Sequence, residues 1–200
     1  MSEWTPIEGE TPIDDMSGLK VKGVTTRSGL NTLEARNILQ ATIQYLASRP
    51  TAKQAPFDLA WVKRLHQEMF GDVWTWAGQI RKVELNLGSP AYQIETLLQQ
   101  LLDDLAYWPE AGMDIIEQAT RLHHRAVSIH PFLNGNGRWA RMLANIWLAR
   151  NGSPLVHWPT DLDHASEYRQ AYLHAIRKAD DHDYGDLLEL HRRFSTPESS

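Results

Sequence analysis

The segment HPFLNGNGRWAR, residues 130–141, gathers residue types that bind phosphate groups. Two glycines around Asn136 allow the backbone to turn tightly where a helical pattern begins, so the N–H groups of the first helical turn converge on one point. Helix N-termini of this kind bind anions. Arg138 and Arg141 are three residues apart on one face of that helix, so both can reach a phosphate chain. The spacing therefore predicts a site for a polyphosphate.

His130 stands immediately before this loop and is the candidate general base. A neutral imidazole at this place can take a proton from an incoming hydroxyl while phosphates lie beside it. On composition alone, a single histidine at a helix terminus is more often a capped or buried structural group. The glycines and arginines that follow within twelve residues favour the chemical role for His130.

Helical patterns surround this segment on both sides. Asn31 with Glu34 three residues later has the spacing of a capping box, after which apolar residues recur with a helical period. A stretch without this period contains a Gly-Ser-Pro turn signal and predicts a β-hairpin over 82–93. Residues 1–30 show no sustained period and predict an extended arm. The predicted helices cover 31–48, 56–70, 95–108, 113–129, 136–150, 161–179 and 185–194.

The composition is that of an ordinary folded protein. The 200 residues are 42% apolar and 22% charged, which excludes disordered and fibrous chains. The absence of cysteine excludes disulfides, thiolate zinc sites and cysteine nucleophiles. The net charge of -5 argues against a surface built wholly for nucleic acid, although residues 118–160 contain five arginines and no Asp or Glu. The acidic N-terminus and the lack of a long apolar run predict a cytoplasmic protein that does not enter a membrane.

The segment 130–141 resembles the signature of Fic-domain proteins, H-x-F-x-[D/E]-G-N-G-R-x-x-R, at every fixed position except the acid. VWTWAGQIR is similar to the segment that leads into the family's flap, and EYRQAYLHAIRKADDHDYGDLLEL to its C-terminal helices. GETPIDD and TTRSGLNTLEARNI are similar to a Fic subgroup called mobile mystery protein B. The resemblance predicts a mainly α fold, a Fic-type helical bundle with a short β-hairpin flap. One Fic domain is expected over 31–195, with its core at about 55–192.

The resemblance also implies an activity, the transfer of AMP from ATP to a hydroxyl of a target protein. His130 would deprotonate the target hydroxyl, and Phe132 would anchor the loop. The hairpin would align a target segment by strand addition. The implied phosphate-binding residues are Gly135, Asn136, Gly137 and Arg138 for the α- and β-phosphates and Arg141 for the γ-phosphate, and the implied flap residues are Lys82, Val83, Glu84 and Leu85.

Asn134 stands where the family has Asp or Glu, the carboxylate that holds Mg²⁺ against the phosphates. A neutral amide is a poorer ligand for Mg²⁺ or Mn²⁺, so the metal affinity should be weakened. Three outcomes remain open. The ATP phosphates and Asn134 suffice, another acid such as Glu84 substitutes, or the site mainly binds nucleotide.

Glu34 is the candidate for a second family trait, a glutamate that inhibits the enzyme by pairing with the second arginine of the motif, here Arg141. The surrounding residues do not match the family's inhibitory pattern. The alternative role of Glu34 is structural, as the partner of Asn31 in the predicted capping box.

Several related activities compete with AMP transfer. The GNGR run favours nucleotidyl transfer over the phosphate transfer of the Doc branch, whose motif resembles A-N-K-R. AMP removal and a nucleotide-binding Fic fold with little or no turnover also remain open. The subgroup resemblance implies a small helix-turn-helix protein as partner, in a pairing like that of a toxin and antitoxin. A direct nucleic-acid role is the least favoured.

Overall fold

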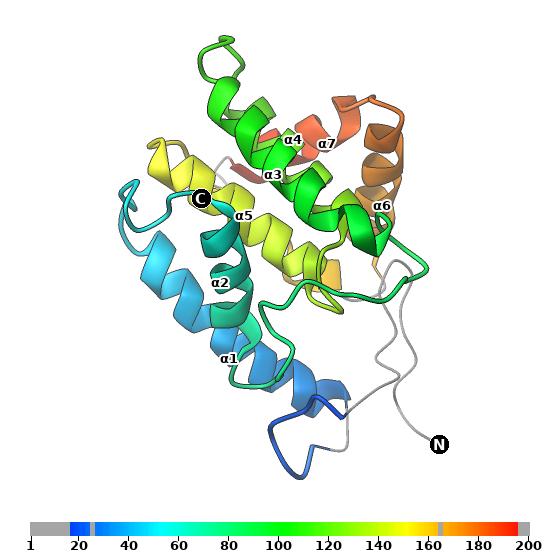
Figure 1. The fold of residues 1–200 in the computed structure, drawn as a ribbon. Coiled ribbons are helices and arrows are strands. Elements are labelled where there is room, and N and C mark those ends of the chain that lie inside the picture. The colour runs from blue at the N-terminus through cyan, green and yellow to red at the C-terminus, as the bar shows by residue number, and fades with distance from the viewer. Residues whose placement is uncertain (1–16, 25–26, 164–165, 196–200) are drawn as a thin grey trace.

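The computed structural model describes residues 17–24, 27–163 and 166–195, and these ranges are mainly helical (Figure 1). This confirms the expected fold class. None of the described helices has the length and apolar character needed to cross a bilayer. The α-helices are α1 (Arg27–Leu46), α2 (Leu59–Phe70), α3 (Ile94–Tyr107), α4 (Ile115–Ile129), α5 (Asn136–Arg150), α6 (Glu167–Asp180) and α7 (Gly185–Ser195), and two 3-10 helices are η1 (Ala91–Gln93) and η2 (Thr160–Asp163).

Side-chain caps fix where several of these helices begin. Asp58 accepts a hydrogen bond of 2.7 Å from the N–H of Trp61 at the start of α2. Asp114 caps α4 and Ser166 caps α6 in the same way. Each cap oxygen satisfies N–H groups that have no acceptor within the helix, so these polar residues set the helix boundaries.

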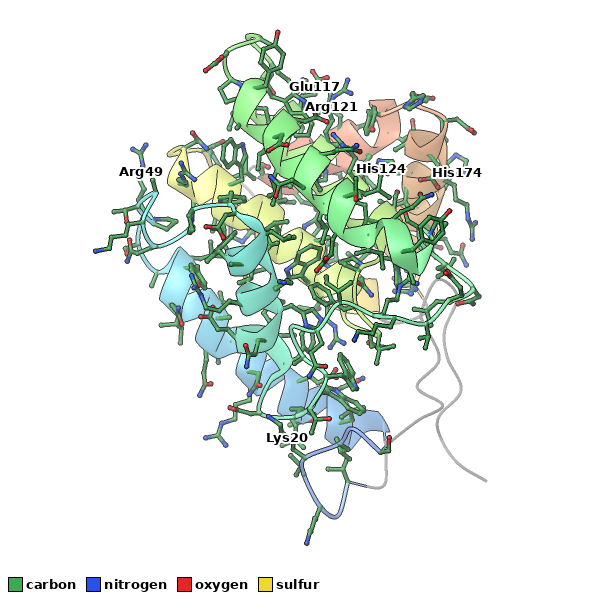
Figure 2. The ribbon with its side chains drawn as sticks, in the orientation of Figure 1. Lys20, Arg49, Glu117, Arg121, His124 and His174 are labelled. Atoms are coloured by element: carbon green, nitrogen blue, oxygen red, sulfur yellow. The ribbon has the colours of Figure 1, made fainter. Side chains whose placement is uncertain are left out.

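Helix α5 lies at the centre of the described fold, with α4 packed along it and α1 and α2 on another side (Figure 1). Its inner face buries Trp139, Leu143 and Ile146 almost completely. Burying side chains of this size stabilises the fold by roughly 1.5–3 kcal/mol each. Glu117 and Arg121 of α4 form a 2.7 Å ion pair away from this inner face (Figure 2). Packing around α5 therefore fixes the start of this helix, where the phosphate-binding segment lies.

The N-terminal predictions are wrong in two respects. Helix α1 begins at Arg27, so Asn31 lies inside the helix and does not cap it. Residues 27–30 are therefore helical, whereas 17–24 are irregular and make an isolated antiparallel bridge between Leu19 and Trp74. The rest of the predicted arm, 1–16 and 25–26, lies outside the described residues.

The predicted hairpin over 82–93 is also corrected, because no residue of this stretch is in a strand. The buried guanidinium of Arg81 donates hydrogen bonds to the carbonyl oxygens of Val83 at 2.8 Å and Ser89 at 2.5 Å. In a hairpin, such carbonyls accept hydrogen bonds from N–H groups of the opposite strand. Here the Arg81 side chain donates these hydrogen bonds in place of an opposite strand. We call residues 82–90 the flap.

Candidate active site

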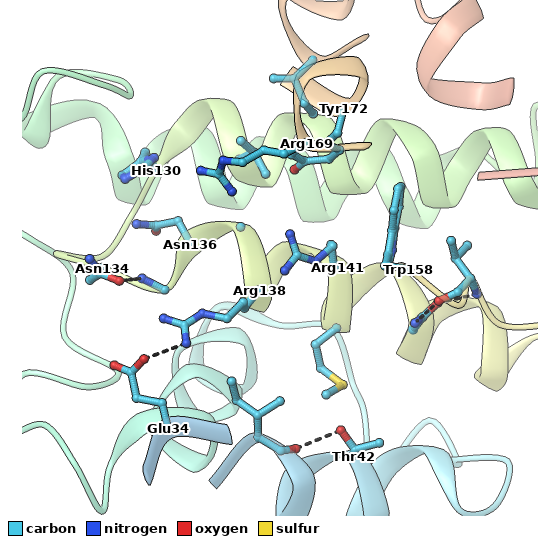
Figure 3. A pocket seen from close by; sticks show the side chains of 18 of the residues that line it. Glu34, Thr42, His130, Asn134, Asn136, Arg138, Arg141, Trp158, Arg169 and Tyr172 are labelled. Atoms are coloured by element: carbon cyan, nitrogen blue, oxygen red, sulfur yellow. Dashed lines mark hydrogen bonds and ion pairs between the residues drawn. The ribbon is translucent and has the colours of Figure 1, made fainter. Parts of the chain in front are cut away.

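A cavity of about 1130 Å³ opens among α1, the flap, the α4–α5 loop, α5, residues 155–160 and α6. In Figure 3, Glu34 extends from α1 toward Arg138 on α5, while Arg169 and Tyr172 extend from α6 on the opposite side. The residues that the sequence predicted for phosphate binding, proton transfer, metal binding and inhibition therefore share one cavity. They are His130, Asn134, Gly135, Asn136, Gly137, Arg138, Arg141 and Glu34.

Two left-handed residues and one side chain shape the α4–α5 loop. His130 ends α4 with φ 54°, and Gly135 precedes α5 with φ 78°. The Asn136 side chain accepts a hydrogen bond from the N–H of Phe132 and donates one to its carbonyl, both at 2.9 Å, and Phe132 is fully buried. As the N-cap of α5, Gly135 brings no side-chain oxygen to the first turn, an arrangement in which a helix terminus can receive an anion.

His130 is buried at the end of α4, with 8% of its surface exposed. Burial is the main cause and the positive charge of Arg81 the second cause that lower its pKa from 6.5 to about 4, against a hydrogen bond with the Val127 backbone that raises it. Because a histidine is neutral above its pKa, the imidazole of His130 is unprotonated at pH 7. This is the form that accepts a proton from a hydroxyl.

Glu34 pairs with Arg138, the first arginine of the motif, and this corrects the partner implied by the resemblance, Arg141. The Nη1 of Arg138 donates to Oε2 of Glu34 at 2.6 Å, and Nε1 of Trp74 donates to Oε1 at 2.6 Å. Both carboxylate oxygens are thus engaged, and Glu34 is 1% exposed. The capping-box alternative is wrong, because Asn31 and Glu34 both lie inside α1.

The last residues of the flap line the cavity, whereas its first residues do not. Leu87, Gly88 and Ser89 are part of the wall. The predicted target-binding residues come earlier in the flap and lie outside the wall: Lys82, Val83 and Glu84 are exposed and Leu85 is half-buried. These residues could still pair with an extended target segment, but they do not form a hairpin strand before it binds.

Comparison with known proteins identifies the central part of the chain. Residues 56–148 match the sequence model of the Fic/DOC family. This segment is similar to a Fic domain. Protein adenylyltransferase fic-1 of Caenorhabditis briggsae is 37% identical over 109 residues, which are 52% of this chain and 21% of that protein. The chain thus spans about a fifth of the length of this curated relative.

Solved structures extend the likeness beyond the matched segment. Fic-1 of Caenorhabditis elegans superimposes with a TM-score of 0.69 and 25% identity, covering 90% of this chain and 52% of that one. BepC of Bartonella tribocorum, solved with bound AMPPNP, gives a TM-score of 0.66 at 17% identity and covers 96% of both chains. The helical arrangement of this chain is therefore the Fic fold.

The donor groups around Asn134 do not fit a magnesium site of this Fic domain. Its Oδ1 accepts a 2.6 Å hydrogen bond from the N–H of Gly135, and its side chain is a neutral amide. The carboxylates on the cavity wall are Glu34, bound as above, and Asp180, which accepts from His124 and Ser128. Within the described ranges, no three acidic or histidine side chains gather to hold a metal ion.

Glu84 does not replace the missing acid. It lies on the flap outside the cavity wall, where its carboxylate accepts a 3.0 Å hydrogen bond from the N–H of Ala91. Of the three outcomes left open by the sequence, substitution by Glu84 therefore has no support from the geometry.

Sequence reasoning missed three residues of the site. His66 on α2 stacks on Phe132 with ring centroids 3.7 Å apart, and its Nε2 hydrogen-bonds the carbonyl oxygen of Asn134 at 3.0 Å. Because the Gly78 N–H donates to Nδ1 of His66, Nε2 must carry the proton. Arg169 and Tyr172 line the cavity from α6 (Figure 3). His66 has no motif around it, and the α6 residues lie in the part of the sequence resemblance that named no individual positions.

Proposed function

We propose that this Fic domain transfers AMP from ATP to a hydroxyl group of a target protein. The observation that carries the proposal is the position of a neutral, buried histidine, His130, just before the N-terminus of α5, the helix that carries Arg138 and Arg141. The curated relative fic-1 is named a protein adenylyltransferase, and BepC of the same fold was solved with AMPPNP. ATP is therefore the nucleotide that we assign to the cavity.

The reaction follows from the arrangement of these groups. The target hydroxyl attacks the α-phosphorus, and His130 removes its proton. The bond between the α-phosphorus and the bridging oxygen to the β-phosphorus breaks, and pyrophosphate leaves. The first turn of α5 and Arg141 stabilise the negative charge that develops on the phosphates. The flap presents the target segment to this centre.

Glu34 acts in this proposal as an inhibitory residue. Its carboxylate lies 2.6 Å from Nη1 of Arg138. This N–H group can donate to a phosphate only after the ion pair with Glu34 breaks. In this pair, the Arg138 side chain points toward Glu34 on α1 (Figure 3). Nucleotide binding and the Glu34–Arg138 pair therefore compete for one guanidinium.

A second candidate function is nucleotide binding with little or no turnover. Asn134 favours it, because an amide cannot neutralise phosphate charge or hold a divalent cation as a carboxylate does. Transfer of phosphate and removal of AMP are the remaining alternatives. All three are separated from AMP transfer by what becomes attached to, or is lost from, the target.

The test mixes the purified chain and a cell lysate with ATP labelled at the α- or the γ-phosphate. AMP transfer attaches the α-label and adds the mass of AMP, whereas phosphate transfer attaches the γ-label. His130→Ala should remove the α-label, and the matched control His174→Ala, an exposed histidine on α6 (Figure 2), should retain it. Binding of AMPPNP without any labelled target would support the second candidate instead.

We also propose a small helix-turn-helix protein as binding partner, on the subgroup resemblance alone. Co-expression with the product of a neighbouring reading frame, followed by co-purification, tests it. A partner that does not co-purify, with both proteins folded, would remove this proposal and leave the activity proposal unaffected.

A further inference from the structure

Arg81 is a buried cation between the flap and the α4–α5 loop. It is 3% exposed and its side chain is fully enclosed. Its Nε donates to the carbonyl oxygen of His130 at 2.7 Å, while its two terminal nitrogens donate to the flap carbonyls of Val83 and Ser89. One guanidinium thus binds both ends of the flap and the main chain of the candidate base.

The backbone repeats this connection. The N–H of Arg81 donates to the Pro131 carbonyl at 2.9 Å, and the N–H of Ser89 donates to the Ile129 carbonyl at 3.2 Å. The two hydrogen bonds lie on either side of His130 in the sequence. Gly88 packs so closely that an added Cβ would collide with the Cβ of His130. The flap is therefore seated directly on the residue that takes the proton.

The main chain of His130 needs such support. Its φ of 54° lies in the left-handed region, which costs energy for a residue with a Cβ. The carbonyl that Arg81 binds belongs to this strained residue. A guanidinium is suited to the task, because its planar fork can donate to several carbonyls at once, whereas a lysine concentrates its charge at one point.

We propose that Arg81 is a positioning residue that couples the flap to the base, so that the segment receiving the target and the imidazole removing its proton keep a fixed relation. The proposal rests on the proposed AMP transfer and deepens it. Arg81 does not line the cavity and contacts no reacting atom in this scheme. Its charge also contributes, after burial, to the lowered pKa of His130.

Other charged groups near His130 must be held constant in a test. On the flap, Glu84 has an oxygen 3.9 Å from Arg81 Nη1. The charged residues on the cavity wall are Glu34 of α1, Arg138 and Arg141 of α5, and Arg169, Arg177 and Asp180 of α6; His157 and Tyr172 are its other titratable residues. Substitutions at Arg81 leave all of these in place.

The decisive measurement is the pKa of the His130 imidazole, followed by NMR in the full chain labelled with ¹⁵N-histidine and assigned with His130→Ala. Arg81→Gln removes the charge, so the pKa of His130 should rise from about 4 toward 6.5, without reaching it because burial is the larger cause. The control Lys82→Gln removes a neighbouring exposed charge and should leave the pKa of His130 unchanged.

The kinetic consequence is a lower kcat, together with a loss of rate at low pH that begins at a higher pH than in the parent chain. In Arg81→Gln, kcat for AMP transfer should fall roughly 10- to 100-fold while KM for ATP changes little, because the base and the hydroxyl are misaligned. The pH–rate profile should fall at a higher pH than in the parent chain. Arg81→Lys keeps the charge but carries all its donors on one nitrogen, which cannot reach three carbonyls that are bound by three different nitrogens of Arg81, so it should lose kcat and keep the low pKa of His130.

A folded Arg81→Gln chain with the parent pKa at His130 would overturn the proposal. The NMR result stands even if no variant transfers AMP, so it separates this proposal from the proposed function. If Arg81→Gln does not fold, Arg81→Lys decides. Faster amide hydrogen exchange over residues 87–89 supports positioning, and exchange equal to that of the parent chain contradicts it.

Discussion

Replacing Glu34 with Gln tests the competition between Glu34 and the nucleotide for Arg138. Glutamine has the same size and keeps an oxygen for the Trp74 N–H, which now donates at 2.6 Å. It removes the charge and the acceptor that face Arg138 at 2.6 Å. The substitution therefore isolates one ion pair and leaves the packing of α1 intact.

The structure gives the expected size of the effect. Hydrogen bonds to charged groups contribute about 1.5–3 kcal/mol. The Glu34 side chain is 2% exposed, but that of Arg138 is 23% exposed, so water screens the pair in part and the lower half of this range applies. Since about 1.4 kcal/mol is a tenfold change in affinity, the substitution should tighten nucleotide binding roughly 10- to 30-fold.

Isothermal titration with AMPPNP measures this affinity without turnover. The matched control is Glu68→Gln on α2, which alters another half-buried carboxylate, one that accepts from Tyr45 and does not line the cavity. The control should bind AMPPNP like the parent chain. An affinity of folded Glu34→Gln that equals that of the control would refute the inhibitory role of Glu34.

Three further predictions follow from the loop and from the buried histidines. Gly135→Ala should lower the free energy of unfolding by about 1–3 kcal/mol, because φ is 78° and the new Cβ would lie 2.6 Å from a phenylalanine ring. Thermal denaturation against Gly137→Ala, where the nearest atom is 3.8 Å away, checks it, and equal melting temperatures contradict it. Asn134→Asp should make AMPPNP bind more tightly when Mg²⁺ is added than it does in the parent chain, and an equal Mg²⁺ effect by titration would show that the carboxylate is not what the site lacks. Burial lowers the pKa of His66 to about 3 and that of His191 to about 4, so between those values and 6.5 each histidine is protonated mainly in the unfolded chain. Each histidine should therefore lower the free energy of unfolding by up to about 1.4 kcal/mol per pH unit as the pH falls below 6.5. In His66→Gln, the slope of this free energy against pH, measured by denaturation, should be smaller than in the parent chain.

The helices around the motif were predictable because they carry their own local signals. The predicted helices 113–129 and 136–150 match α4 and α5 to within two residues, and Gly135 separates the two helices. The flap was not predictable in the same way. Its shape depends on the Arg81 side chain, whose three carbonyl acceptors come from both the flap and the loop at His130. These acceptors are far apart in the sequence and come together only in the folded chain.

The site shows the same division between local and distant information. The motif lies in one stretch of sequence, so its residues could be recognised together. Glu34 and Arg138 are 104 positions apart, and His66 and Asn134 are 68 apart. Which arginine of the motif faces Glu34 depends on how α1 packs against α5, and helical period alone gives no answer. That is why Arg141 was expected and Arg138 was found.

The two departures of this chain, at Asn134 and at Glu34, act on the same side of the reaction. His130 is neutral at pH 7, since its pKa is lowered to about 4, so it can accept a proton, although the same lowering makes it a weaker base. The phosphate side lacks a carboxylate at Asn134, and its first arginine is bound to Glu34. Asn134 lies at the end of the loop and Arg138 in the first turn of α5, so in the proposed site both would face one phosphate chain and changes at the two positions should not add independently. In the proposed AMP transfer, these two positions therefore act on binding of the nucleotide and leave the base, His130, unchanged.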